Sequence, residues 1–165
     1  MVNFMYYLNY FFIFSILGHF IEGFFYYSGE SGILLGYWTQ IYGIGVIVML
    51  LVFKLLNKTK LNKYTKAIFL FLICSIILSS MEILGGYLIK RIFHKIMWDY
   101  SNHKFNIGIF TSLEMAFVWG ISSVIFIYII KPLIDKIINK IPRYFTYILI
   151  ILFIIDNIAT IIMKV

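Results

Sequence analysis

Charged side chains are scarce in this sequence, and their scarcity excludes an ordinary soluble domain. Asp, Glu, Lys and Arg make up 13% of the 165 residues, whereas 62% are hydrophobic and 20% are aromatic. Soluble domains carry roughly 25% charged residues. The single cysteine, Cys74, excludes an intramolecular disulfide, and no C-x-x-C metal or redox spacing occurs. No G-x-x-x-x-G-K-[ST] motif is present, so the chain is not itself a P-loop ATPase.

Long apolar runs take the place of charge. A helix that spans a bilayer needs about 20 mostly apolar residues, and no ten-residue alternation indicates a barrel. We therefore predict an all-α integral membrane bundle in a single domain, residues 1–165, with spans over approximately 4–26, 33–56, 67–89, 107–130 and 144–163. Neither Lys nor Arg precedes the first run and no small-residue cleavage site follows it, so we expect it to be retained as a span. Three glycines and Gln40 predict a break in the second span between Gly36 and Gly45.

The cations lie between the apolar runs, which favours positive flanks of membrane helices over a nucleic-acid surface. Five spans divide the connections between two sides, here called side A and side B. Side A has the N-terminus and connections 54–66 and 131–143, with nine of the fourteen Lys and Arg; side B has connections 27–32 and 90–106 and the C-terminus. The positive-inside rule makes side A cytoplasmic, so we predict a multi-pass membrane protein with a cytoplasmic N-terminus. Lipid head groups are the expected counter-charge, and the apolar spacing between Pro132 and Pro142 predicts a short amphipathic surface helix.

The acidic residues have the opposite bias. Of seven, only Asp135 falls on side A; the side-B acids are Glu22, Glu30, Glu82, Asp99, Glu114 and Asp156. Ionisable groups inside a bilayer cost a few kcal/mol each and usually face the bundle interior or a wet cavity. Small and polar residues also share helix faces, as in the series from Ser75 through Ser79 and Glu82 to Gly86. These patterns predict a polar cavity open to side B, walled by the first four spans and roofed by the 98–106 connection.

We expect this cavity to bind a cation or a cationic group. The predicted binding residues are Glu22, Glu82, Trp98, Asp99, Tyr100 and Asn106, and the predicted lining residues are His19, Gln40, Ser79 and Glu114. The carboxylates would contact the solute, the aromatic side chains would close over it with cation–π contact, and Asn106 would orient the 98–106 connection. We predict no catalytic residue, metal site or cofactor.

Simpler interpretations remain open. The small-residue stripes can be packing surfaces alone, Trp98 and Tyr100 can be interfacial anchors, and Glu22 or Glu82 can form structural pairs. His19 is more typical of a hydrogen-bonded interior histidine than of a metal ligand. His94 and His103 beside Asp99 match no strong metal spacing.

The order of these segments resembles the CmpB-type ABC-transporter type IV permease family of small bacterial membrane proteins. The resemblance covers almost the whole chain, and its matching segments are residues 14–22, 41–45, 81–86, 98–101, 105–107 and 119–120. This chain departs from the family pattern at four places. His19 stands where the family has Trp, Gln40 where it has Pro, and Ile109-Phe110 where it has Gly-Arg. The family also has a Gly-Pro pair near the position of Gly36-Tyr37. The resemblance therefore implies a divergent member of this family in the bacterial cell membrane. It also implies a permease-like role and fixes no substrate.

Three functions follow as hypotheses. The first is a small permease-like transport component, not an enzyme by itself, that requires a separate ATPase subunit or another partner and for which self-association is plausible. The second is a membrane-embedded enzyme that acts on a lipid or isoprenoid substrate through paired carboxylates. The third is a structural or regulatory subunit in which the polar stripes are only helix interfaces.

Overall fold

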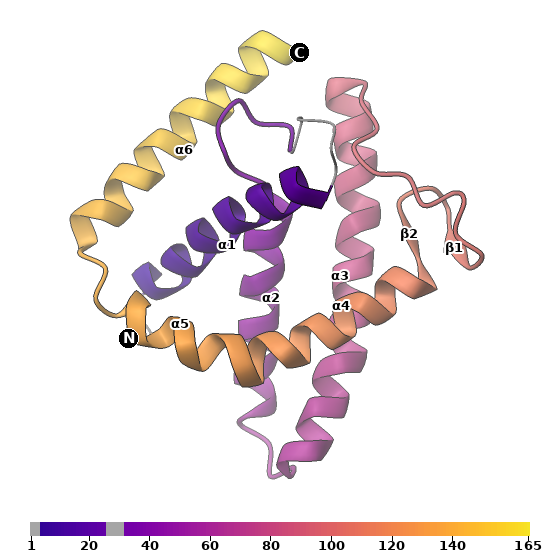
Figure 1. Ribbon diagram of the computed structural model, residues 1–165, viewed down its shortest axis with the longest axis vertical. Helices are drawn as coiled ribbons and strands as arrows, with labels where there is room; N and C mark the ends of the chain where they lie inside the picture. Colours follow the sequence, from indigo (N-terminus) through magenta and orange to yellow (C-terminus); the bar gives the residue numbers. More distant parts are fainter. Residues whose placement is uncertain (1–3, 26–31) are drawn as a thin grey trace. The chain divides into compact units, whose positions relative to one another are not determined.

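The computed structural model describes residues 4–25 and 32–165, and it confirms a nearly all-α architecture (Figure 1). Glu30 lies outside the described residues. The helices and strands are α1 (Phe4–Phe25), α2 (Gln40–Leu56), α3 (Lys63–Phe93), β1 (Asn106–Ile107), β2 (Thr111–Ser112), α4 (Leu113–Ile125), the π-helical segment η1 (Phe126–Ile130), α5 (Lys131–Ile138) and α6 (Arg143–Lys164).

Four of the described helical stretches are long and apolar enough to cross a membrane. They are Phe4–Phe24, Lys63–Phe93, Leu113–Ile138 and Arg143–Lys164. Helix α2 is apolar but has 17 residues, which at 1.5 Å per residue span about 25 Å, less than the hydrocarbon core of about 30 Å.

The second apolar run is helical only from Gln40 onward. Residues 33–39, which the predicted span included, form an irregular segment, so the predicted break is present but lies before Gln40. Glycine permits the local geometry, since Gly32 has a φ of +80°. Side chains of α6 bind the backbone of this segment, as described below, and so replace the hydrogen bonds that a helix would have made.

The fourth run begins later and ends later than expected. Residues before Leu113 form an antiparallel hairpin in which Asn106 pairs with Ser112, and its turn includes Gly108 at a φ of +66°. The helix then continues to Ile138, past Pro132. A proline has no N–H for an i→i−4 bond, and the π-helical bond from the Lys131 N–H to the Phe126 carbonyl shifts the register just before it. The predicted surface helix is therefore the end of a long helix.

The chain divides into two compact units, residues 1–46 with 135–165 and residues 47–134. In the first unit, the rings of Phe12, Trp38 and Phe153 meet edge to face, with centroids 5.7–5.9 Å apart. The Thr146 hydroxyl donates to Asn9 at 2.7 Å. Two tyrosines of α1, at positions 6 and 10, donate to the same oxygen of Asp135 at 2.8 Å. These contacts join α1 to α5, α6 and the irregular segment.

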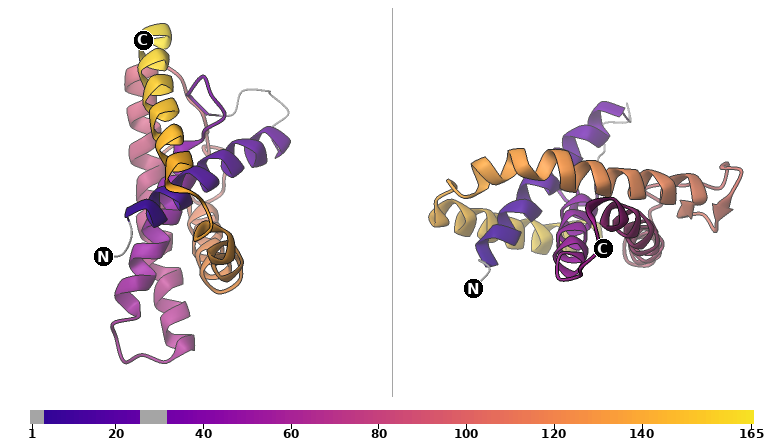
Figure 2. Two further views of the ribbon diagram at one scale, coloured as in Figure 1. Left: turned by 90° about the vertical axis from the view of Figure 1, so that its left-hand side faces the viewer. Right: turned by 90° about the horizontal axis from the view of Figure 1, so that it is seen from below.

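In the second unit, α4 packs across α3 (Figures 1 and 2). Gly120 permits this close approach, because a Cβ atom there would overlap Ser75 and the ring of Phe71. The small residues of the predicted stripe therefore serve helix packing at this crossing.

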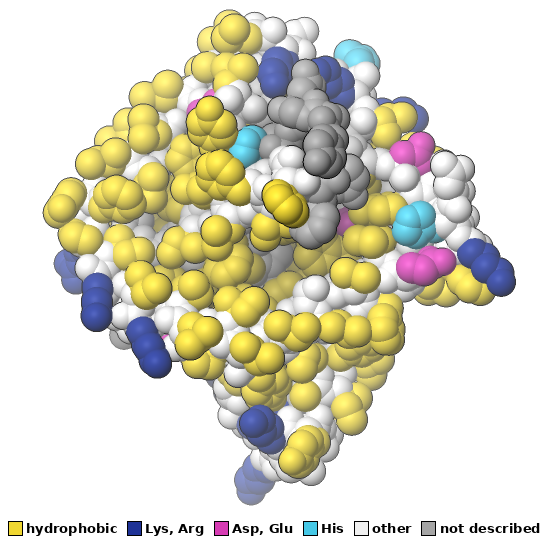
Figure 3. Space-filling model, viewed as in Figure 1, with side chains coloured by type: hydrophobic (Ala, Val, Ile, Leu, Met, Phe, Trp, Pro, Cys, Tyr) yellow, Lys and Arg dark blue, Asp and Glu magenta, His cyan; other side chains and the backbone are white. Residues whose placement is uncertain are grey.

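Outward-facing side chains of α6 are largely apolar. Ile151, Ile158 and Ile162 follow helical spacing and are all exposed. Hydrophobic side chains cover most of the face in Figure 3. Such surfaces are expected where lipid, and not water, surrounds the protein.

The α3–α4 crossing gives a stability prediction. Gly120→Val places a branched side chain against Ser75 and Phe71, and we expect the overpacking to lower the free energy of unfolding by about 1–3 kcal/mol. Thermal unfolding in lipid nanodiscs measures the change. The control is Val118→Leu on the same helix, where the side chain is 48% exposed. An unchanged midpoint in Gly120→Val would contradict the close packing.

Candidate functional site

Glu82 is a buried carboxylate on α3 in the second unit. Its side chain is 4% exposed. The Thr111 hydroxyl donates to Oε2 at 2.8 Å, the Tyr100 hydroxyl donates to Oε1 at 3.4 Å, and Trp119 is a further polar neighbour. Buried carboxylates require such donors, because an unpaired buried charge costs several kcal/mol. Two of the predicted binding residues, Glu82 and Tyr100, are thus in contact with each other.

The segment that follows α3 packs onto the end of that helix through aromatic side chains. Trp98 donates its indole N–H to the Phe110 carbonyl at 3.1 Å, and the ring of Phe110 lies edge-on to Tyr87 with centroids 4.9 Å apart. Gly86 makes room, since a Cβ atom there would overlap the Phe110 ring. The segment is therefore packed against α3, and Trp98 has a structural contact of its own.

Asp99 and Asn106 make local contacts at the surface. The Ser101 N–H donates to Asp99 at 2.7 Å, and the Asn106 amide donates to the Gly108 carbonyl at 3.1 Å. Hydrogen bonds from the hydroxyl and N–H of Ser101, with the nearby charge of Lys90, lower the pKa of the exposed Asp99 carboxyl. Each residue stabilises its own turn.

Glu114 lies in the first turn of α4 beside His103. Its carboxylate is 3.9 Å from His103 Nδ1, and the same nitrogen is 3.1 Å from the Ser112 hydroxyl. Ser112 also accepts from the Met115 N–H, which caps α4. Both side chains approach one ring nitrogen, whereas a hydrolytic triad uses both nitrogens. This cluster therefore stabilises a helix start.

In the first unit, Glu22 is next to the start of α2. It accepts a hydrogen bond from the Thr39 hydroxyl at 3.4 Å, and Tyr42 also bonds to it. The Thr39 N–H in turn donates to the Ser15 carbonyl at 2.9 Å. His19 lies edge-on to the Tyr37 ring, with centroids 5.2 Å apart. Glu22 thus fixes one end of the irregular segment.

Polar side chains of α6 fix the other end. Both carboxylate oxygens of Asp156 accept from the Gly36 N–H at 3.1 Å. The Thr160 hydroxyl accepts from the Leu35 N–H at 3.1 Å, and Lys164 donates to the Ile33 carbonyl at 2.9 Å. Asp156, Thr160 and Lys164 recur every four residues, so they form one helix face. This face satisfies backbone groups that the irregular segment leaves unpaired.

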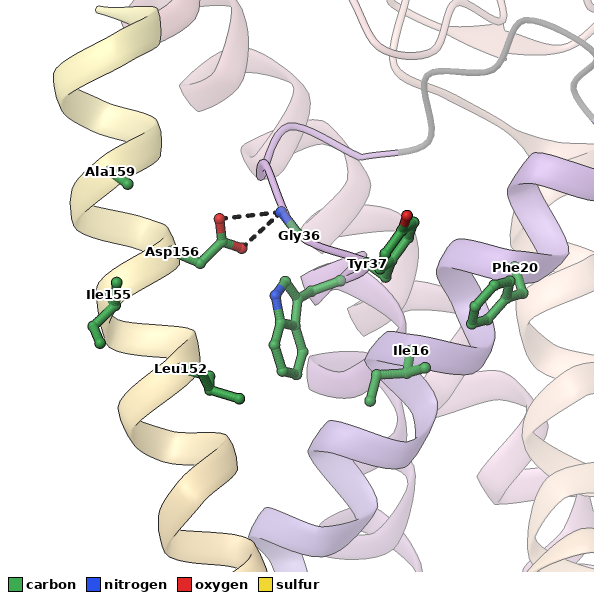
Figure 4. Close-up of a pocket in the computed structure, with 9 residues that line it drawn as sticks. Ile16, Phe20, Gly36, Tyr37, Leu152, Ile155, Asp156 and Ala159 are labelled. Atoms are coloured by element: carbon green, nitrogen blue, oxygen red, sulfur yellow. Dashed lines mark hydrogen bonds between the residues drawn. The ribbon is translucent and has the colours of Figure 1, made fainter.

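A pocket of about 540 Å³ lies beside this contact (Figure 4). Its residues come from α1, the irregular segment and α6, all in the first unit. Aliphatic side chains and aromatic rings cover most of it: Ile16, Leu152, Ile155, Ala159, Phe20, Tyr37 and Trp38. Asp156 is the single acidic residue in its wall, and in the described part of the chain no cationic side chain pairs with it.

The predicted candidates occupy several places. Glu22, His19 and Gln40 belong to the first unit, and Ser79, Glu82, Glu114 and the 98–106 residues belong to the second. None of the predicted candidates lines the pocket in Figure 4. No group of three or more His, Cys, Asp or Glu among the described residues is arranged to hold a metal ion.

Asp156, Asn157 and Thr160 are the residues that the sequence argument undervalued. Asn157 accepts from the Gln40 amide at 2.9 Å, so it too contacts the start of α2. The sequence does contain a sign of their role, because polar residues on one face of the final apolar run have to face protein or water.

The family model described as "Putative ABC-transporter type IV" matches residues 9–163. The chain belongs to this family. It is therefore a membrane protein related to transport. No curated protein and no solved structure matches the chain.

Two departures from the family pattern now have structural correlates. Phe110, at the position of the expected arginine, is 1% exposed and fills the space above Gly86. Gln40, at the position of a proline, bonds to Asn157. At both positions the side chain of this protein makes a packing or hydrogen-bonding contact.

The Glu82 network gives the next prediction. Thr111→Val keeps the side-chain shape but removes the shortest donor to a buried carboxylate, so we expect a loss of about 1–3 kcal/mol in unfolding free energy. Thermal unfolding in nanodiscs measures this loss. Thr65→Val, in the partly exposed first turn of α3, is the matched control. A double-mutant cycle with Glu82→Leu checks the cause: additive effects would show that Thr111 acts independently of Glu82.

Proposed function

We propose that the protein is a permease-like subunit, not itself an enzyme, that binds a cationic solute in the pocket beside Asp156. The observation that supports this most is an irregular backbone segment that interrupts an apolar run and lies next to a cavity. The wall of this cavity has one carboxylate, with which no cationic side chain of the described residues pairs. In membrane transporters, irregular backbone at membrane depth lines cavities, and interrupted helices form substrate sites.

The family membership supports transport, and the chemistry of Asp156 supports a cation. A carboxylate in a largely apolar wall favours a ligand of opposite charge. Glu22 contributes indirectly, because it holds Thr39 at the far end of the same segment. Glu82 is given a structural role in this proposal, since it is buried, it does not line the pocket, and its oxygens accept hydrogen bonds from Thr111 and Tyr100.

The energy for transport would come from a separate ATPase subunit. The sequence has no phosphate-binding P-loop motif, and the family name associates the chain with ABC transport. In the proposed arrangement the protein lies in the bacterial cell membrane, its N-terminus is cytoplasmic, and the pocket and residues 90–106 are toward the outer side.

Orientation can be tested by cysteine labelling. Asn102 and Lys60 are exposed positions in two different connections, and the native Cys74 is buried. We expect a membrane-impermeant maleimide to label Asn102→Cys in intact cells, and to label Lys60→Cys only after the cells are permeabilised. The opposite pattern would reverse the proposed orientation. The unsubstituted protein reports background labelling of Cys74.

Binding can be tested with tetramethylammonium and with sodium as probes. We expect at least one of them to stabilise the protein in nanodiscs, and Asp156→Asn to weaken that binding by about tenfold or more, the scale of a lost charge-assisted contact. The asparagine oxygen can still accept from Gly36, so folding should persist. Asp99→Asn removes an exposed negative charge elsewhere and serves as the control. Equal binding by Asp156→Asn, or no stabilisation by any cation, would refute the site.

A further inference from the structure

We infer that the pocket takes an organic ammonium ion with an apolar body, and not a bare metal cation. This inference rests on the proposed function and specifies its solute. It follows from the few polar groups that the pocket wall offers and from the large apolar area around them.

A bare cation would lack ligands here. Metal ions such as Ca²⁺ or Mg²⁺ are held by six or more oxygen atoms. Asp156 is the single carboxylate in the wall, and both of its oxygens already accept from the Gly36 N–H at 3.1 Å. Thr160 also contacts one of these oxygens, at 3.5 Å. The carboxylate can neutralise a charge beside it, but it cannot replace a full hydration shell.

An ammonium group with carbon substituents avoids this requirement. It is weakly hydrated, it pairs with one carboxylate, and aromatic faces attract it. Tyr37 and Phe20 supply such faces in the pocket wall, and their rings are stacked with centroids 6.1 Å apart. Figure 4 shows both rings across the pocket from Asp156. Charge recognition and aromatic contact are therefore available in one cavity.

The rest of the wall suits a hydrocarbon chain. Leu152, Ile155 and Ala159 follow the same face of α6 below and above Asp156, and Ile16 faces them from α1 (Figure 4). A volume of about 540 Å³ falls within the usual range for organic ligands, roughly 300–1,000 Å³. An apolar body of several carbon atoms would fill space that a metal ion leaves empty.

A homologous series tests the inference. We would titrate tetramethylammonium and alkyltrimethylammonium ions of increasing chain length, all below micelle formation, into protein-containing nanodiscs, with empty nanodiscs to correct for lipid partitioning. Burial of each added methylene should tighten binding about fourfold until the pocket is full. Sodium and magnesium should bind more weakly than every ammonium ion.

A pocket-filling variant separates pocket binding from lipid partitioning. Ala159→Leu reduces the cavity, so it should weaken octyltrimethylammonium binding by about tenfold and leave tetramethylammonium binding within about twofold. The control is Ile158→Leu, which places a leucine at an exposed position of α6 without adding side-chain volume. Asp156→Asn should weaken the whole ammonium series.

The outcomes distinguish the inference from the proposed function. Binding that depends on Asp156 but is independent of chain length, or is strongest for a metal ion, would overturn the inference and leave the cationic permease intact. Binding of neutral octanol as tight as that of octyltrimethylammonium would also overturn it. If no cation bound in a manner that depends on Asp156, the proposed function itself would fail.

Discussion

The need to satisfy backbone hydrogen bonds in lipid is the constraint on which this structure depends. A free N–H or C=O in the hydrocarbon core costs several kcal/mol, so irregular backbone persists there only with other partners. The segment 33–39 has such partners on α6, where Asp156 and Thr160 accept from successive N–H groups and Lys164 donates to a carbonyl. Without that polar face, the same residues would gain by continuing α2 toward its N-terminus. The fold of this region therefore depends on side chains more than one hundred residues away in sequence.

Two acids, one in each unit, follow the same rule in different ways. Glu82 receives hydroxyl donors from Thr111 and Tyr100, which come from the segment between α3 and α4. That arrangement uses the carboxylate to hold a connection in place. Asp156 receives one backbone N–H on both oxygens and the Thr160 hydroxyl on one of them, and it borders an open cavity. Among the described residues no cationic side chain pairs with Asp156, so it is the better candidate for ligand binding.

The sequence was sufficient for the features that depend on composition and local spacing. Apolar length predicted the membrane helices, and the glycines with Gln40 predicted an interruption of the second run. Tyr100 and Glu82 were assigned to one predicted cavity, but the hydrogen bond between their side chains was not predicted. The continuation of the helix past Pro132 could not be foreseen, because it depends on the register shift at Phe126. The hydrogen bonds between Gly36 and Asp156 could not be predicted either, since the residues on a helix face do not indicate which backbone groups they will contact.

The position of Asp156 also links ligand binding to backbone conformation. A cation in the pocket would compete with the Gly36 N–H for the carboxylate oxygens of Asp156. It would therefore weaken that hydrogen bond. The opposite end of the segment is held by Glu22 through Thr39, and Gln40 at the start of α2 is bonded to α6 through Asn157. Any change at Gly36 therefore acts on a short segment that is tied at both ends. A solute bound at this carboxylate, as proposed, would therefore act on the hydrogen bond that holds Gly36 just before helix α2 begins.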